Sequence, residues 1–98
     1  MKEDLLKIIN HYGVMPQLKY FQSEVFEMNE AIINYEYDCL EYEEIEKELK
    51  KHIVEEIADV MVMIEQFRHY YNISSEEVTK IFWSKVNRQL ERINNENK

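Results

Sequence analysis

The sequence feature that most constrains the fold is the unbroken stretch from His52 to Tyr71. It contains no glycine and no proline, and its apolar residues recur at three- and four-residue steps. Two apolar stripes cover most of its circumference: Ile53, Ile57, Val60, Ile64 and Phe67, and Val54, Ala58 and Met61. Such a pattern is typical of a buried helix. It therefore predicts a long central helix in the core of an all-helical protein.

Asp59 lies in the middle of this stretch, with Glu55 and Glu56 four and three residues before it. Residues at these spacings share one side of a helix. Three carboxylates there repel one another, and a buried charge without a partner costs on the order of several kcal/mol. We therefore expect a group from outside the helix to compensate the charge, and a divalent cation is the natural candidate.

Apolar residues at helical spacing predict three further helices. They are expected over Lys2–His11, from Gln17 to about Tyr35, and from about Ser75 to Ile93. The only glycine and the only proline fall in the first break, Tyr12–Pro16. Strand-like alternation of useful length is absent from the sequence. We therefore expect one domain over residues 1–98, an all-α bundle of about four helices.

The sequence also marks the helix ends. A loop is expected near Tyr37–Leu40, with the central helix beginning around Glu41–Glu44. Asn72 is expected to end that helix, because Asn tolerates left-handed backbone. Ser74, three residues before Glu77, has the capping-box pattern that starts a helix.

The composition and net charge limit the kinds of partner that the chain is expected to bind. The chain has 98 residues, of which 45% are hydrophobic and 12% aromatic, more apolar surface than a bundle of this size buries. We therefore expect a homodimer or homotetramer. The net charge of −8 argues against binding nucleic acid or an anionic membrane. Cys39 is the only cysteine, and the N-terminus lacks the apolar core of a signal peptide, so a cytoplasmic location is expected.

Two pairs of acids are candidate metal ligands. Glu24 and Glu27 are three residues apart on the second predicted helix, and Glu56 and Asp59 are three apart on the central one. If the two helices pack face to face, four carboxylates converge, and such oxygen donors favour Mg²⁺ or Mn²⁺. Acid pairs also arise by chance as surface residues in a chain with 20 Asp and Glu. The expected burial of Asp59 favours the metal interpretation.

A basic edge lies on the last predicted helix, where Lys85, Arg88 and Arg92 recur at helical spacing. These residues suit a polyphosphate, since Arg makes bidentate contacts and Lys supplies a point charge. A solvated edge with salt bridges is the ordinary alternative. The three histidines are scattered, none follows a Glu by three residues, and each is interpreted as an ordinary surface or boundary residue.

Three segments resemble a known family. SEVFEMNEAI, EEIADVMVMI and KVNRQLERI are similar to the MazG-like all-α nucleoside triphosphate pyrophosphohydrolases, and the resemblance spans roughly Gln17 to Ile93. It implies a helical bundle completed by dimers or tetramers. It also implies Mg²⁺-dependent hydrolysis of NTPs or dNTPs to the monophosphate and pyrophosphate. Two positions depart from the family pattern: Ser23, where an acid is frequent, and Phe26, where a small residue is frequent.

The resemblance also implies roles for single residues. Carried over by position, the metal ligands are Glu24, Glu27, Glu56 and Asp59, and the residues that reach the phosphates are Lys85 and Arg88. A carboxylate not fully engaged by the metal would orient or deprotonate the attacking water, and Glu27 and Glu55 are both candidates.

A non-enzymatic function remains open at this stage. A small, acidic, aromatic-rich helical protein can be a binding module, either a nucleic-acid mimic or an antitoxin-like partner of a basic protein. In that case the acids are spread over the surface, and Asp59 is satisfied by donors of the protein itself.

Overall fold

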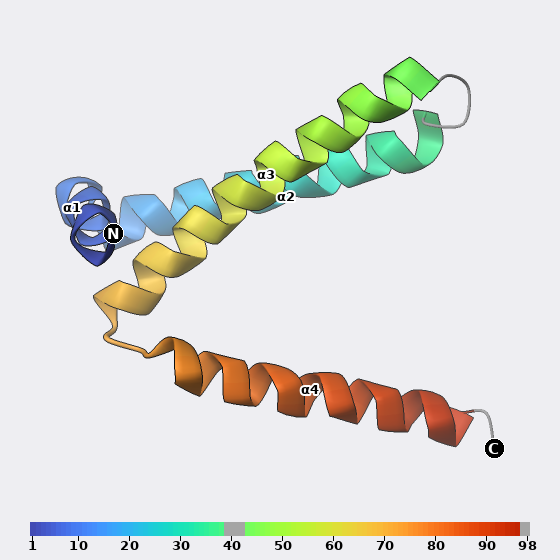
Figure 1. The fold of residues 1–98 in the computed structure, drawn as a ribbon. Helices are drawn as coiled ribbons and strands as arrows, with labels where there is room; N and C mark the ends of the chain where they lie inside the picture. The colour runs from blue at the N-terminus through green and yellow to red at the C-terminus, as the bar shows by residue number, and fades with distance from the viewer. Residues whose placement is uncertain (39–42, 97–98) are drawn as a thin grey trace.

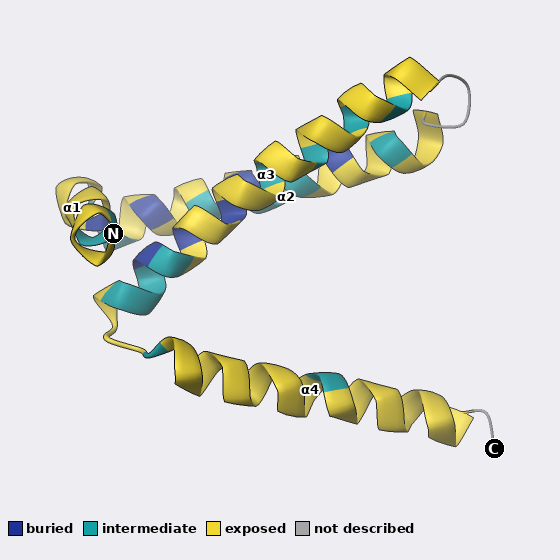
Figure 2. Ribbon diagram, viewed as in Figure 1, coloured by how far each residue is buried: buried dark blue, intermediate teal, exposed yellow. Residues whose placement is uncertain are grey.

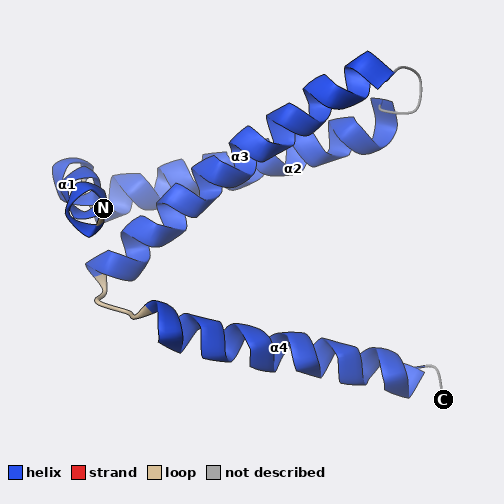
Figure 3. Ribbon diagram, viewed as in Figure 1, coloured by secondary structure: helices blue, strands red, loops and turns tan. Residues whose placement is uncertain are grey.

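The computed structural model describes residues 1–38 and 43–96. They form four α-helices: α1 (Lys2–Tyr12), α2 (Val14–Asp38), α3 (Glu43–Tyr70) and α4 (Ser75–Glu96) (Figures 1 and 3). No strand occurs in these residues, so the all-α prediction is confirmed. None of these described helices is both long enough and apolar enough to cross a membrane.

A single glycine separates α1 from α2. Gly13 has a φ of 94°, a left-handed backbone that favours glycine, and its amide donates to the Ile9 carbonyl at 2.8 Å. The predicted break over Tyr12–Pro16 is therefore too long. Pro16 lies in the first turn of α2, where its missing amide leaves no intrahelical hydrogen bond unmade.

The core lies between the antiparallel helices α2 and α3, and α1 packs across one end of this pair (Figures 1 and 2). Its buried apolar residues are Ile9, Ala31, Val60 and Met63. Helix α2 extends further than predicted, to Asp38, so Tyr37 is helical rather than part of a loop. The rest of that expected loop, Cys39–Leu40, and the first two residues of the expected helix start, 41–42, lie outside the described residues.

Helix α4 leaves the other three helices at a turn (Figure 1). As predicted, Asn72 has left-handed backbone, with a φ of 55°. The predicted capping box is also present: the Glu77 amide donates to Ser74 Oγ at 3.1 Å, and the Ser74 amide donates to Glu77 Oε1 at 3.1 Å. No residue of α4 is buried (Figure 2). A single chain therefore does not close the four-helix bundle.

The prediction that α3 is buried nearly all round is wrong for a single chain. Val54 is 61% exposed and Met61 is 58% exposed, and only Val60, Met63 and Gln66 are buried along this helix. Helices α1 and α2 cover one face of α3, whereas α4 diverges from α3 beyond the turn that joins them (Figure 1). The prediction that Asp59 is a buried acid is wrong for the same reason, because Asp59 is exposed.

Candidate metal centre

Three of the four predicted ligands meet between α2 and α3. Glu24, Glu27 and Glu56 each offer one carboxylate oxygen, and these three oxygens lie within 4.8 Å of one another. The three-residue step from Glu24 to Glu27 places both side chains on the side of α2 that faces α3. The packing of the two helices then brings Glu56 to them.

Two oxygens of this cluster have no hydrogen-bond partner. Glu24 is only 4% exposed, and Oε2 of Glu24 and Oε2 of Glu56 are both buried and unpaired. Buried polar atoms are nearly always satisfied, because an unpaired one loses its hydration without compensation. A cation between the carboxylates would supply that compensation. An octahedral Mg²⁺ site has ligand oxygens about 3 to 4 Å apart, so small side-chain shifts suffice.

Each buried carboxylate also has a neighbour one turn earlier on its own helix. His52 Nε2 lies 3.2 Å from Glu56 Oε1. The Tyr20 hydroxyl hydrogen-bonds Glu24, and this bond, followed by the charge of the Glu24 carboxylate, raises the pKa of Tyr20. Both residues were missed in the sequence. The four-residue spacings from Tyr20 to Glu24 and from His52 to Glu56 were the available signal.

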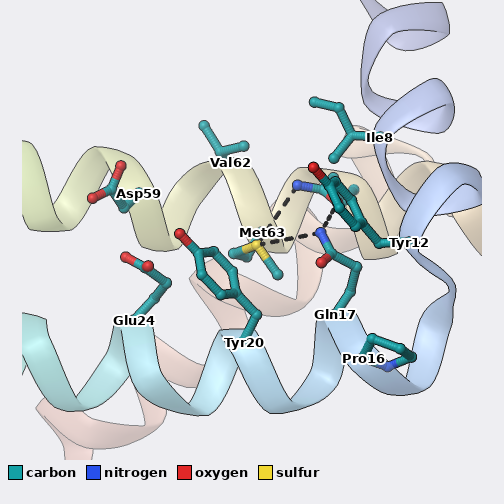
Figure 4. A pocket seen from close by; sticks show the side chains of 10 residues that line it. Ile8, Tyr12, Pro16, Gln17, Tyr20, Glu24, Asp59, Val62 and Met63 are labelled. Carbon is teal, nitrogen blue, oxygen red and sulfur yellow. Dashed lines mark hydrogen bonds between the residues drawn. The ribbon is translucent and has the colours of Figure 1, made fainter.

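The other predicted site residues lie outside this three-carboxylate group. Asp59 is exposed and lines the adjoining pocket beside Glu24 (Figure 4). Glu55 is exposed on α3. Lys85 and Arg88 lie on α4, which diverges from α2 and α3 (Figure 1), so a single chain does not bring them to the carboxylates.

A pocket of about 490 Å³ opens beside the carboxylates, between α1, α2 and α3 (Figure 4). Its far end holds two buried amides, and Gln17 Nε2 donates to Gln66 Oε1 at 2.8 Å. Both amides also contact the Met63 sulfur, at 4.0 and 3.6 Å. The rings of Tyr12 and Tyr20 line the pocket as well. It therefore offers aromatic faces and amide groups next to a candidate cation site.

Comparisons of this chain with protein-family models, with curated proteins and with solved structures found no match. The assignment of a function therefore depends on the carboxylate cluster, the pocket and the sequence motifs.

Proposed function

We propose that this protein is a Mg²⁺-dependent pyrophosphohydrolase of nucleoside triphosphates or deoxynucleoside triphosphates, with Mn²⁺ as an alternative metal. The observation that supports the proposal best is the convergence of Glu24, Glu27 and Glu56 with two buried, unpaired oxygens. The sequence resemblance supplies the reaction class.

Glu24, Glu27 and Glu56 would hold the metal, and Asp59 would bind at its outer side, from the rim of the pocket. When bound, the metal supplies positive charge that neutralises the triphosphate and the charge that grows on the leaving pyrophosphate. His52 and Tyr20 would orient the carboxylates of Glu56 and Glu24, because each contacts one carboxylate.

In the reaction, a water oxygen attacks the α-phosphorus and the bond between that phosphorus and the α–β bridging oxygen breaks. Pyrophosphate leaves, and the water proton passes to a carboxylate. Glu27 is the better candidate for this base, because it belongs to the cluster and is exposed, so water reaches it. Glu55 is exposed but lies outside the cluster, which makes it the second candidate.

The nucleoside would occupy the adjoining pocket, with the base against Tyr12 or Tyr20 and its polar edge toward the amides of Gln17 and Gln66. Lys85 and Arg88 are the proposed contacts of the outer phosphates. Because α4 stands apart from the carboxylates of its own chain, this role requires an assembly in which an α4 reaches the site.

The test is pyrophosphate release from a panel of NTPs and dNTPs, measured with Mg²⁺ and with EDTA. Wild type should release pyrophosphate only with Mg²⁺. Glu56→Gln should lower kcat/KM by about 100-fold or more, because it weakens the metal site. Glu48→Gln, an exposed carboxylate elsewhere on α3, is the matched control and should keep wild-type activity.

Two results would contradict the proposal. One is hydrolysis that persists in EDTA or in Glu56→Gln. The other is a wild type that neither hydrolyses any substrate of the panel nor melts at a higher temperature with millimolar Mg²⁺. The second result would favour the acidic binding module.

A further inference from the structure

We propose that Gln17 selects the base of the nucleotide. It favours a base with an amino group at its tip, as in cytosine and adenine, over one with a carbonyl oxygen there, as in uracil and hypoxanthine. This selectivity rests on the proposed function in one respect, namely that the phosphates lie at the carboxylate end of the pocket. Gln17 is a specificity residue in this proposal and takes no part in the hydrolysis.

The end of the pocket away from the carboxylates is built from two amide side chains that are almost fully buried. Gln17 of α2 is 6% exposed and Gln66 of α3 is 2% exposed, and both line the pocket. Gln17 Nε2 donates to Gln66 Oε1 at 2.8 Å, across the contact between the two helices. Buried amides lose their hydration, so any polar atom that this pair leaves unpaired favours a ligand that can satisfy it.

The sulfur of Met63 determines which way round the two amides lie. It lies 4.0 Å from Gln17 Nε2 and 3.6 Å from Gln66 Nε2. A thioether sulfur accepts hydrogen bonds and donates none, so both NH₂ groups turn toward it. Turning Gln17 alone would place its oxygen against Gln66 Oε1, and turning both amides would place two oxygens against the sulfur. The orientation with both nitrogens toward Met63 is therefore favoured.

One strong acceptor of this pair is left for a ligand. Because Gln17 Nε2 is turned to Gln66 and Met63, the remaining polar atom of this amide is its oxygen. Oε1 of Gln17 makes no hydrogen bond with any residue that the structure describes, and no dashed line reaches it in Figure 4. A ligand in the pocket therefore satisfies this atom only with a hydrogen-bond donor.

The two ends of the pocket determine which part of a base Gln17 would meet. With the triphosphate at the carboxylates, the sugar would lie beside Tyr20, between Glu24 and the amides (Figure 4). In cytosine and uracil, the group that differs lies across the ring from the bond to the sugar, so it points furthest into the pocket. In adenine and hypoxanthine it lies on the six-membered ring, away from the sugar. An amino group there donates to Gln17 Oε1, whereas a carbonyl oxygen faces it as a second acceptor.

The first experiment compares substrates that differ in this tip group, CTP with UTP and ATP with ITP, by pyrophosphate release with Mg²⁺. In each pair that is hydrolysed, kcat/KM should be at least about 10-fold higher for the amino-bearing nucleotide, because the carbonyl leaves a buried acceptor unpaired. Equal values, or a higher value for UTP or ITP, would overturn the proposal.

Two variants test the orientation of the amides. Met63→Leu keeps the volume of the core but removes the acceptor that orients both glutamines, so it should lower the preference for the amino-bearing nucleotide. Gln22→Leu, which replaces an exposed glutamine of α2, is the matched control and should keep the wild-type preference. An unchanged preference in Met63→Leu would refute the orienting role of the sulfur.

The second experiment separates this proposal from the proposed function, because it needs neither metal nor hydrolysis. Cytidine, uridine, adenosine and inosine are titrated in EDTA into isotopically labelled wild type, and the side-chain NH₂ signals of Gln17 and Gln66 are followed by NMR. Cytidine or adenosine should shift both signals and bind at least about 10-fold more tightly than the matching oxo nucleoside.

The two experiments fail in different ways. Selective binding of cytidine or adenosine without hydrolysis of any triphosphate would refute the proposed function and leave the base selection standing. Hydrolysis with no preference for the amino group would refute the base selection alone. Amide signals that respond to no nucleoside at millimolar concentration would mean that the base does not reach Gln17, and would also overturn the proposal.

Discussion

His52 Nε2 lies 3.2 Å from Glu56 Oε1, one turn apart on α3, while the second oxygen of Glu56 is buried and unpaired. The imidazole therefore contacts one oxygen of the carboxylate, and the other oxygen is left for a further ligand. This is the arrangement by which an outer partner orients a metal ligand. His52 is about half exposed, so it can be replaced without opening the core.

His52→Ala is therefore expected to weaken Mg²⁺ binding by about 10-fold, with little loss of stability, because only the orienting contact disappears. Titration calorimetry of the metal measures this. His11→Ala, on the exposed side of α1, is the control and should bind Mg²⁺ like wild type. Unchanged affinity in His52→Ala would mean that His52 only makes a surface ion pair.

Glu24→Gln should separate two effects of the buried carboxylate: the loss of stability it causes without metal and the Mg²⁺ binding it provides. Without metal, stability should hold or rise by about 1 kcal/mol, because the variant removes a buried charge that has an unpaired oxygen. With Mg²⁺ the order should reverse, since wild type gains binding free energy and the variant gains little. Melting curves in EDTA and in Mg²⁺ measure both effects. The control is Glu30→Gln, an exposed acid of α2 that should melt like wild type under both conditions.

Asp59→Asn is the contrasting variant. Because Asp59 is exposed, its replacement should change metal-free stability by no more than about 0.5 kcal/mol.

If Glu24→Gln lost the same stability with and without Mg²⁺ and kept full activity, Glu24 would be a structural acid rather than a metal ligand.

Replacing Lys85 and Arg88 together by Ala should raise KM for the triphosphate by about 10-fold or more, because charge-assisted contacts to phosphate are lost. The Mg²⁺-dependent shift of the melting temperature should stay, since neither residue belongs to the carboxylate cluster. Steady-state kinetics measure the KM, and melting curves measure the Mg²⁺-dependent shift. Lys80→Ala, elsewhere on α4, is the control. Wild-type KM together with a lost Mg²⁺ shift would refute the assigned role.

The capping box predicts a pH effect. The pKa of Glu77 lies below its usual value of 4.5 because its carboxylate accepts hydrogen bonds from Ser74. The bond from the Ser74 amide has the larger effect, and the bond from the Ser74 hydroxyl comes second. A lowered pKa in the folded state stabilises the protein above the ordinary pKa, and this contribution is lost as pH falls through the lowered value. Wild type should therefore melt above Glu77→Gln at pH 7, and the gap should narrow in acid below pH 4.5. A melting-temperature difference between wild type and Glu77→Gln that does not change with pH would contradict this assignment. The same pH-dependent difference between wild type and Glu48→Gln would contradict it as well.

The helices and their ends were largely predictable, because they depend on local chemistry. The features that set them act within one or two turns of the chain. They are the absence of Gly and Pro from the central stretch, the capping box of Ser74 and Glu77, and the tolerance of Asn72 for left-handed backbone. The early start of α2 was missed because a single residue, Gly13, suffices to end α1 and turn the chain into α2 (Figure 1). At the candidate site, the three-residue spacing nominated Glu24 with Glu27 and Glu56 with Asp59 but did not exclude chance pairs of surface acids. The expected burial of Asp59, which favoured the metal interpretation, was wrong.

The sequence by itself determined four-helix content and a set of acids able to meet on two helices. Only the tertiary structure decided which acid is buried. Asp59 lies within an apolar stretch but is exposed, and Glu24 lies within a mixed stretch but is 4% exposed. The physical reason is that burial depends on what covers each face of a helix. Here α2 covers the Glu56 side of α3, and α4, directed away by the hydrogen-bonded turn at Arg68 and Ile73, leaves the opposite side to solvent or to another chain.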